Sequence, residues 1–157
     1  MRFWQKALLC SLLCVFLGGA SGLFGASSIG SWYAQLSRPA GTPPNAVFGP
    51  VWTTLYICIG VSFALMWHRV QPGSHRKQAM RLFIIQWCLN LSWTPLFFGA
   101  RQLGFALVIL LALVTALTLT VHHFYRLERT AGILLVPYLL WILYATYLNA
   151  GFWLLNR

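Results

Sequence analysis

Apolar residues run through most of the chain in long stretches, separated by short polar or proline-rich segments. A helix needs roughly 20 apolar residues to cross the hydrocarbon core of a bilayer, and five of the stretches have about that length. The pattern therefore predicts an all-α integral membrane bundle of five transmembrane helices, forming a single domain over residues 1–157. The expected helices cover residues 6–27, 46–70, 78–99, 102–124 and 131–154.

The first apolar stretch also has features of a secretory signal peptide, because Arg2 and Lys6 precede an apolar core that ends in small residues. No charge appears between Lys6 and Arg38, however, and the apolar character resumes after the small residues. The run is long enough to span a membrane, so we favour a retained first helix over a cleaved peptide.

Small residues one helical turn apart form a ridge on this first helix: Gly18, Gly22 and Ala26. Such a ridge lets a second helix approach closely. The loop that follows, residues 28–45, contains Pro39, Pro43 and Pro44. Because proline fixes its own φ and restricts the residue before it, this loop is predicted to be stiff.

Three predicted helices carry aromatic, amide and aliphatic side chains at three- and four-residue steps, which place them on one face of each helix. On the second helix they are Phe48, Trp52, Tyr56, Ile59 and Phe63. On the third they are Gln86, Asn90, Trp93 and Phe97, and on the fifth Tyr138, Trp141, Ala145 and Leu148. Such faces either pack helix against helix or line a ligand site, and the pattern alone leaves both readings open.

Asn90 falls at predicted membrane depth, where hydrocarbon offers an amide no partner. We expect it to point inward, either to bind a ligand carbonyl or to tie the third helix to another helix, for example through Asn149. Pro95 removes one backbone hydrogen bond and predicts a kink just past Asn90.

The composition excludes several functions. Charged residues make up 8% of the chain and Glu128 is its only acid, so no carboxylate pair exists for acid–base catalysis or for a metal site. The four cysteines lie within apolar runs without paired spacing and are expected to be packing residues. The eleven basic residues are scattered at segment ends rather than gathered in one patch, which argues against a nucleic-acid partner.

The same basic residues predict the orientation of the chain in its membrane. Eight of the eleven lie in the N-terminus and in the second and fourth loops, whereas the other three are Arg38, Arg101 and Arg157. The N-terminus should therefore face the cytoplasm, with the cell (inner) membrane as the favoured location. The proline-rich first loop should lie outside.

Three separated segments resemble one family. They are WYAQLSRP with TPP and FGPVWTTLY, then NLSWTPLFFGARQ, then PYLLWILYATYLN. In order and content these segments are similar to the TspO/MBR family of tryptophan-rich sensory proteins and translocator proteins. The resemblance implies a five-helix bundle, usually a homodimer, whose pocket binds protoporphyrin IX and drug-like hydrophobic molecules without an obligatory cofactor.

The resemblance also implies which residues bind the ligand. Matched motif by motif, they are Tyr33, Trp52, Asn90, Trp93, Trp141 and Ala145. Tyr56 extends the aromatic face that Trp52 begins. Arg38 is the nearest basic residue for the propionate groups of a porphyrin, although it is equally suited to anchor the chain at the membrane interface.

Two positions depart from the family's pattern. Gly41 stands where the family usually has tryptophan, and this departure predicts a looser lid over the pocket. The positions that correspond to the animal cholesterol motif are Ala150, Gly151 and Leu154, which lack its aromatic and basic residues. Cholesterol is therefore not predicted as the natural ligand.

We accordingly predict a membrane receptor or sensor linked to tetrapyrrole metabolism or traffic. A tetrapyrrole transporter is one alternative, although no charge at membrane depth or inverted repeat points to coupled transport. Light-dependent porphyrin degradation is another, since an excited porphyrin and nearby tryptophans would supply that chemistry. The four histidines all lie at segment ends, so a metal-free porphyrin is expected rather than a haem iron.

Overall fold

Helices make up nearly the whole computed structural model, which describes residues 1–157. Five helical spans are long and apolar enough to cross a membrane. They are α1 (Phe3–Ile29), α3 (Asn45–Arg69), α4 (Ser74–Thr94) with its continuation η1 (Pro95–Gly99), α5 (Leu103–Leu127) and α6 (Arg129–Leu155). The predicted all-α membrane fold with five transmembrane helices is confirmed.

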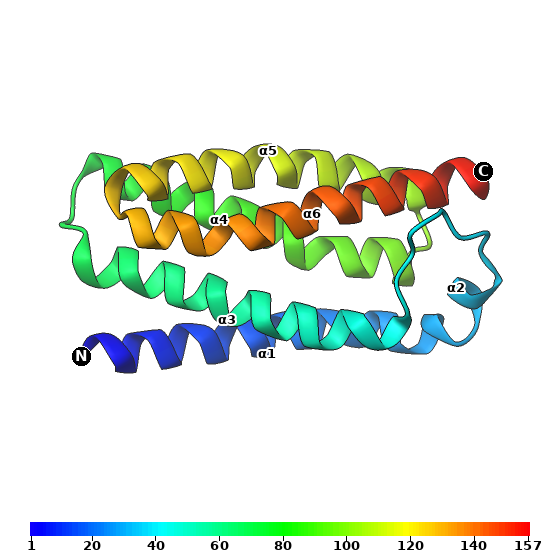
Figure 1. Cartoon of the computed structure of the whole chain (residues 1–157), viewed down its shortest axis with the longest axis horizontal. Coiled ribbons are helices and arrows are strands. Elements are labelled where there is room, and N and C mark those ends of the chain that lie inside the picture. Colours follow the sequence, from blue (N-terminus) through cyan, green and yellow to red (C-terminus); the bar gives the residue numbers. More distant parts are fainter.

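The helix boundaries differ from the sequence prediction by up to four residues, and the largest differences lie on either side of the second long helix. The loop expected over residues 28–45 contains a short helix, α2 (Trp32–Gln35), visible in Figure 1. The third long helix, α4, begins at Ser74 rather than at residue 78. Residues 74–77 are polar and precede the apolar run, but they form the first turn of the helix.

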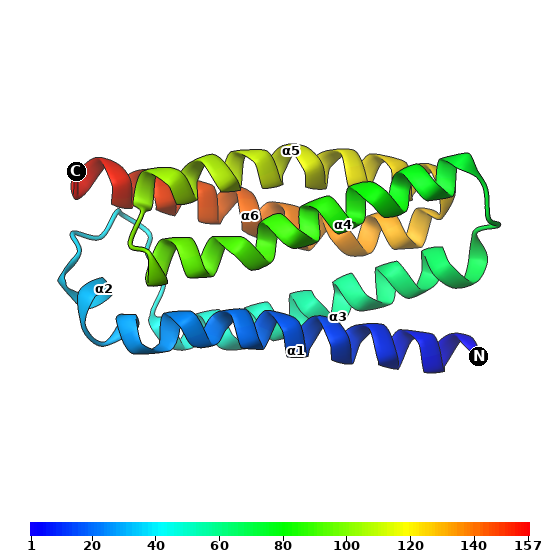
Figure 2. The ribbon, with the colours of Figure 1, turned by 180° about the vertical axis from the view of Figure 1, so that it is seen from behind.

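The five spans form a ring in which three of the five neighbouring pairs are consecutive along the chain and two are not. α1 packs on α3, α3 on α6, α6 on α5 and α5 on α4, and α4 with η1 returns to α1. Figures 1 and 2 show the N-terminus and the α3–α4 and α5–α6 turns at one end of the bundle. The α1–α3 loop, the α4–α5 turn and the C-terminus lie at the other end.

α1 contacts the bundle through a narrow seam of small residues that repeats every three or four positions. Its buried members are Cys10, Ser11, Cys14, Gly18, Ser21, Gly25 and Ser28. Of the predicted ridge, Gly18 is in the seam, where a Cβ would collide with the Tyr56 ring. Gly22 and Ala26 are exposed instead, because the seam steps by three residues after Gly18 and then by four.

The kink predicted at Pro95 takes the form of a π-helical segment. Proline has no N–H, so the Leu91 carbonyl loses its normal partner four residues later. The Ser21 hydroxyl of α1 donates to that carbonyl at 2.8 Å, and seven residues further on the Ser28 hydroxyl donates to the carbonyl of Phe98 at 2.9 Å. α1 thus supplies the hydrogen bonds that the irregular end of the third span requires.

We expect Ser21→Ala to destabilise the protein by about 1–3 kcal/mol, because the Leu91 carbonyl would be left buried without a donor. Thermal unfolding in detergent measures the effect, with Ser27→Ala as the control, since Ser27 is exposed on the same helix. Equal melting temperatures for the two variants would contradict this account of the α1 seam.

Candidate ligand-binding cavity

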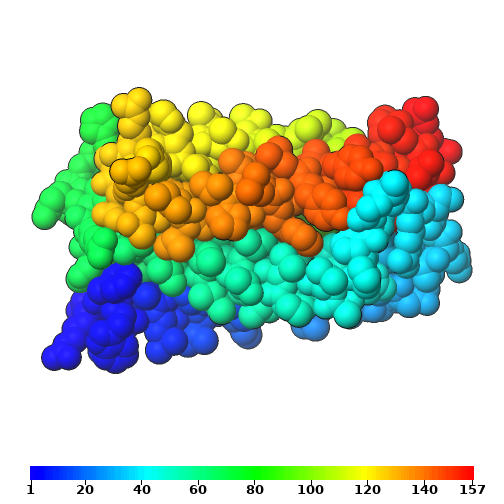
Figure 3. Space-filling model, in the orientation of Figure 1, coloured from blue at the N-terminus to red at the C-terminus, as the bar shows by residue number.

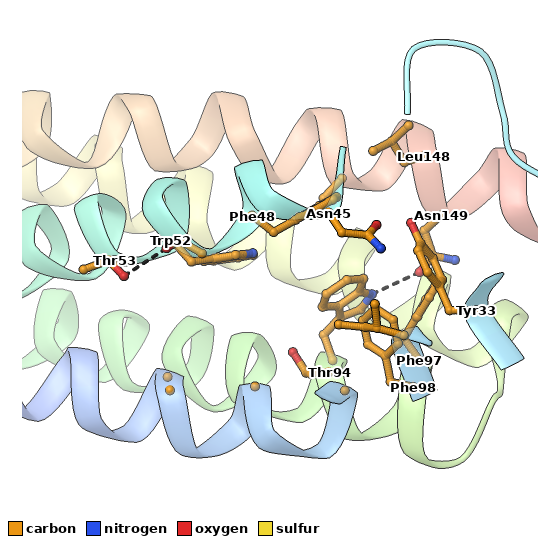
Figure 4. A pocket seen from close by; sticks show the side chains of 18 of the residues that line it. Tyr33, Asn45, Phe48, Trp52, Thr53, Thr94, Phe97, Phe98, Leu148 and Asn149 are labelled. Carbon is orange, nitrogen blue, oxygen red and sulfur yellow. Dashed lines mark hydrogen bonds between the residues drawn. The ribbon is translucent and has the colours of Figure 1, made fainter. Parts of the chain in front are cut away.

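A cavity of about 390 Å³ lies between α1, α3, η1 and α6, in the half of the bundle nearer the C-terminus. Eight of its 21 lining residues are aromatic. The aromatic lining residues are Tyr33, Phe48, Trp52, Tyr56, Trp93, Phe97, Phe98 and Phe152. Figure 4 shows Phe48 and Trp52 toward one end of the cavity and Tyr33, Phe97 and Phe98 toward the other.

The wall that α1 contributes is made largely of glycine. Gly18, Gly19, Gly22 and Gly25 all line the cavity. At Gly18 and Gly25 the facing rings of Tyr56 and Phe98 occupy the space beside the backbone. Gly19 and Gly22 have open space around them and are exposed, as are Gly49 and Thr53 across the gap on α3. The cavity therefore reaches the lipid-facing surface between α1 and α3.

One hydrogen-bonded chain crosses the polar part of the wall. The Trp93 indole Nε1 donates to Asn149 Oδ1 at 3.0 Å (dashed line to Asn149 in Figure 4). The Asn149 amide Nδ2 in turn donates to the Leu103 carbonyl at 2.8 Å. Asn149 is thus tied to the third span by Trp93 and not by Asn90, contrary to the pairing considered from the sequence. The bonds fix the Trp93 indole against the cavity.

Five of the eight residues predicted to bind ligand line the cavity: Tyr33, Trp52, Tyr56, Trp93 and Ala145. The structure does not place Arg38, Asn90 or Trp141 on its wall. Arg38 is exposed and its guanidinium lies over the outer side of the Tyr33 ring, 5.3 Å from the centroid. It is therefore separated from the cavity by Tyr33.

Trp52 lies on the cavity wall and contacts Trp141, which does not line the cavity. It stacks on Tyr56 with the centroids 5.3 Å apart. It also meets Tyr138 and Trp141 edge-on, at 6.5 and 6.4 Å. Beyond it the Tyr138 hydroxyl donates to Gln86 Oε1 at 3.1 Å.

Three buried polar atoms outside the cavity wall have no hydrogen-bond partner: Gln86 Nε2, Asn90 Oδ1 and Trp141 Nε1. Unpaired buried groups are rare in proteins and each costs free energy, so their clustering beside one cavity requires an explanation. Together they offer two donors and one acceptor to any polar molecule that reaches them.

Tyr33 closes the end of the cavity from α2. It is 4% exposed, and its ring packs against Phe98 and Phe152 with centroids 5.4 and 5.3 Å apart. Burial raises the pKa of its phenol above the usual value, and the nearby charge of Arg38 partly opposes that shift. The hydroxyl therefore stays protonated at neutral pH and can act as a hydrogen-bond donor.

The loop after α2 is fastened to α6 rather than loosely held. The hydroxyls of Tyr144 and Tyr147 donate to the carbonyls of Gly41 and Ala40. The Asn156 side chain pairs with both backbone groups of Ser37, at 2.8 and 3.0 Å. Figure 3 shows the loop in contact with the C-terminal part of α6.

Gly41 has a conformational reason to be glycine. Its φ is +82°, in the left-handed region that a tryptophan would occupy only with strain. The loose lid expected from the missing tryptophan is therefore wrong for this loop, since other side chains hold it.

Sequence reasoning missed the contributions of α1 and of η1 beyond Phe97. The sequence pattern had placed Gly18 and Gly22 on a packing ridge. It did not place them, or Gly25, on the wall of a cavity. Asn45, Phe98 and Phe152 also line the cavity without having been singled out. Aromatic spacing on α3 had pointed to Phe48, which contacts Trp141 edge-on at 6.0 Å.

Fold and cavity together define a five-helix integral membrane protein with an aromatic internal site. The family profile described as the TspO/MBR family matches residues 10–154, and the chain belongs to this family.

Its relatives include the tryptophan-rich protein TspO of Archaeoglobus fulgidus, 41% identical over 95% of this chain and 96% of the relative. The human translocator protein is 42% identical over 78% of this chain and 73% of its own length. A tryptophan-rich sensory protein of Cereibacter sphaeroides is 37% identical over 75% of this chain and 72% of its own.

Replacing both loop-fastening tyrosines, as Tyr144→Phe with Tyr147→Phe, should free the loop while leaving the rings in place. We expect faster amide hydrogen exchange over residues 37–44, because local opening no longer breaks two side-chain hydrogen bonds. Mass spectrometry of peptides from deuterated protein reports this directly. Tyr125→Phe is the control, since the Tyr125 hydroxyl makes no such bond to the loop. Unchanged exchange in the double variant would show that the two tyrosine hydrogen bonds do not hold the loop.

Proposed function

We propose that this protein is a membrane receptor or sensor that binds porphyrins, such as protoporphyrin IX, and drug-like hydrophobic molecules in the aromatic cavity. The supporting observation is the cavity itself, in which aromatic residues of α2, α3, α4, η1 and α6 line an apolar space beside one hydrogen-bonded amide. Flat aromatic ligands gain both apolar contact and ring stacking in such a space.

A tetrapyrrole needs more room than the cavity has in this conformation. At about 390 Å³ the volume is near the lower end of the range for ligand pockets, roughly 300–1,000 Å³. Trp52 lines the cavity and contacts Trp141, so we expect its side chain to move when a larger ligand binds. Rotation of the Trp52 side chain would join the cavity to the region of Trp141 and Asn90, whose unpartnered atoms would then face the ligand.

Receptor function is favoured over driven transport because no charged side chain lines the cavity. A coupled transporter needs ionisable groups on its pathway. Names such as translocator protein and tryptophan-rich sensory protein among the relatives support a role in membrane traffic or sensing. Assembly as a homodimer and an N-terminus in the cytoplasm stay predictions.

Light-dependent porphyrin breakdown is a second candidate, favoured by the position of two tryptophans, Trp52 and Trp93, on the cavity wall. Excited porphyrin would pass its energy to dissolved oxygen, the oxidant, with the indoles within reach of the bound ring. Loss of porphyrin absorbance that needs light, oxygen and Trp52 together would separate this activity from binding alone.

Trp52→Ala should weaken protoporphyrin IX binding about tenfold or more, because an aromatic contact and its buried apolar area are lost together. The Soret band of the porphyrin follows binding without relying on protein fluorescence. Trp4→Ala is the matched control, because Trp4 is 57% exposed and remote from the cavity. Equal affinities of both variants and the wild type would remove the cavity as the porphyrin site.

Asn90→Leu distinguishes a ligand-binding amide from a structural one. Because Asn90 Oδ1 has no partner, the variant should be at least as stable as the wild type while binding porphyrin more weakly. Asn149→Leu is the control and should melt lower, since it breaks the bonds to Trp93 and Leu103. A large loss of stability in Asn90→Leu, or undiminished affinity, would contradict the assignment.

A further inference from the structure

A second hollow lies at the opposite end of the molecule from the aromatic cavity, on the outer side of α4. It measures about 710 Å³ and starts at the α3–α4 turn. Figure 2 shows α4 on the near face, with its first turns beside this turn. The lining residues are Pro72, Gly73, Arg76, Lys77, Met80, Arg81, Ile84 and Ile85.

The lining changes from basic to apolar along the helix axis. Arg76, Lys77 and Arg81 come first. Ile84 and Ile85 follow and leave 52% and 51% of their surfaces exposed. At 1.5 Å per residue, positions 77 and 85 are about 12 Å apart along the axis. The order is that of a membrane boundary, with charges at the level of the headgroups and aliphatic side chains at the level of the acyl chains.

None of the three basic groups has an acidic partner. Glu128 is the only acid in the chain, and it pairs with Arg69 at 3.2 Å. The Arg76 guanidinium is held in place by the end of α3, since it donates to the carbonyls of Val70 and Trp67 at 3.0 and 3.4 Å. The groove thus presents a fixed guanidinium beside two exposed cations, all three without a counterion from the protein.

The charge arrangement disfavours a second copy of this chain as the occupant. In a two-fold symmetric contact each residue near the axis faces the same residue or its neighbours. Lys77 and Arg81 would then face like charges across the interface. An anion relieves this repulsion, and it also complements the positive end of the α4 dipole, where two of the cations lie.

We propose that this groove is a binding site for an anionic glycerophospholipid. The phosphodiester is held by Lys77, Arg81 and the remaining N–H groups of Arg76, and one acyl chain lies along Met80, Ile84 and Ile85. The apolar part of the groove selects a lipid over free phosphate, because only a lipid covers both isoleucines. The site is separate from the aromatic cavity, with which it shares no lining residue.

Native mass spectrometry of the detergent-purified protein tests the site. Phosphatidylglycerol is added at matched concentrations to the wild type, to Lys77→Gln/Arg81→Gln and to Arg126→Gln/Arg129→Gln. The second pair removes the same charge from the turn between α5 and α6, which lies outside the groove. We expect the groove variant alone to lose about tenfold in phosphatidylglycerol affinity, from the loss of two basic contacts. Arg76 is left intact because it also caps α3.

Phosphatidylcholine and glycerol phosphate are added in separate measurements as comparisons. The same spectra give the masses of the oligomers. The wild type should retain phosphatidylglycerol in preference to phosphatidylcholine, and glycerol phosphate should not compete at the same concentration. Equal losses in the two double variants would reduce the effect to general surface charge and overturn the proposal. Equal retention of phosphatidylcholine, or a gain of dimer in the groove variant with lipid binding unchanged, would overturn it as well. An unaltered melting temperature of the groove variant in detergent verifies that it is folded.

Discussion

Hydrocarbon offers no water to a backbone carbonyl, so each carbonyl that leaves regular helical bonding at membrane depth needs a donor from the protein. Pro95 creates that need in the third span, and the seam of α1 meets it through Ser21 and Ser28. The position of α1 follows, because the two hydroxyls reach their carbonyls only when small residues bring α1 close. The serine spacing and the small residues of the seam together supply the hydrogen bonds that the π-helical turn needs.

The same small residues make the cavity. α1 contributes mostly glycines to the cavity wall, while α3, α4, η1 and α6 contribute large rings that are held by one another and by the bond between Trp93 and Asn149. A bundle with bulky residues on every wall would fill its interior. Pairing a glycine wall with an aromatic wall keeps the helices in contact at Gly18 and Gly60 and leaves an apolar space between the contacts.

Polar atoms in the core fall into two groups. Those that hold helices together are paired, as in the chain from Trp93 through Asn149 to the Leu103 carbonyl. Gln86 Nε2, Asn90 Oδ1 and Trp141 Nε1 are not paired. Each unpaired buried group costs free energy, and apolar residues in the same places would avoid that cost.

The five spans, the aromatic face of α3, the kink at Pro95 and the family itself were determined by the sequence, because span length, residue spacing and proline chemistry are local properties. The tertiary structure decided which neighbour each face meets. Periodicity placed Asn90 and Trp93 on one face. Only the relative rotation of α4 and α6 decided that Asn149 bonds to Trp93 and that Trp141 packs against Trp52. The fastening of Gly41 by Tyr144 likewise joins residues about a hundred positions apart. Such pairings depend on how helices are rotated and shifted against each other, and that is set by the packing of the whole bundle.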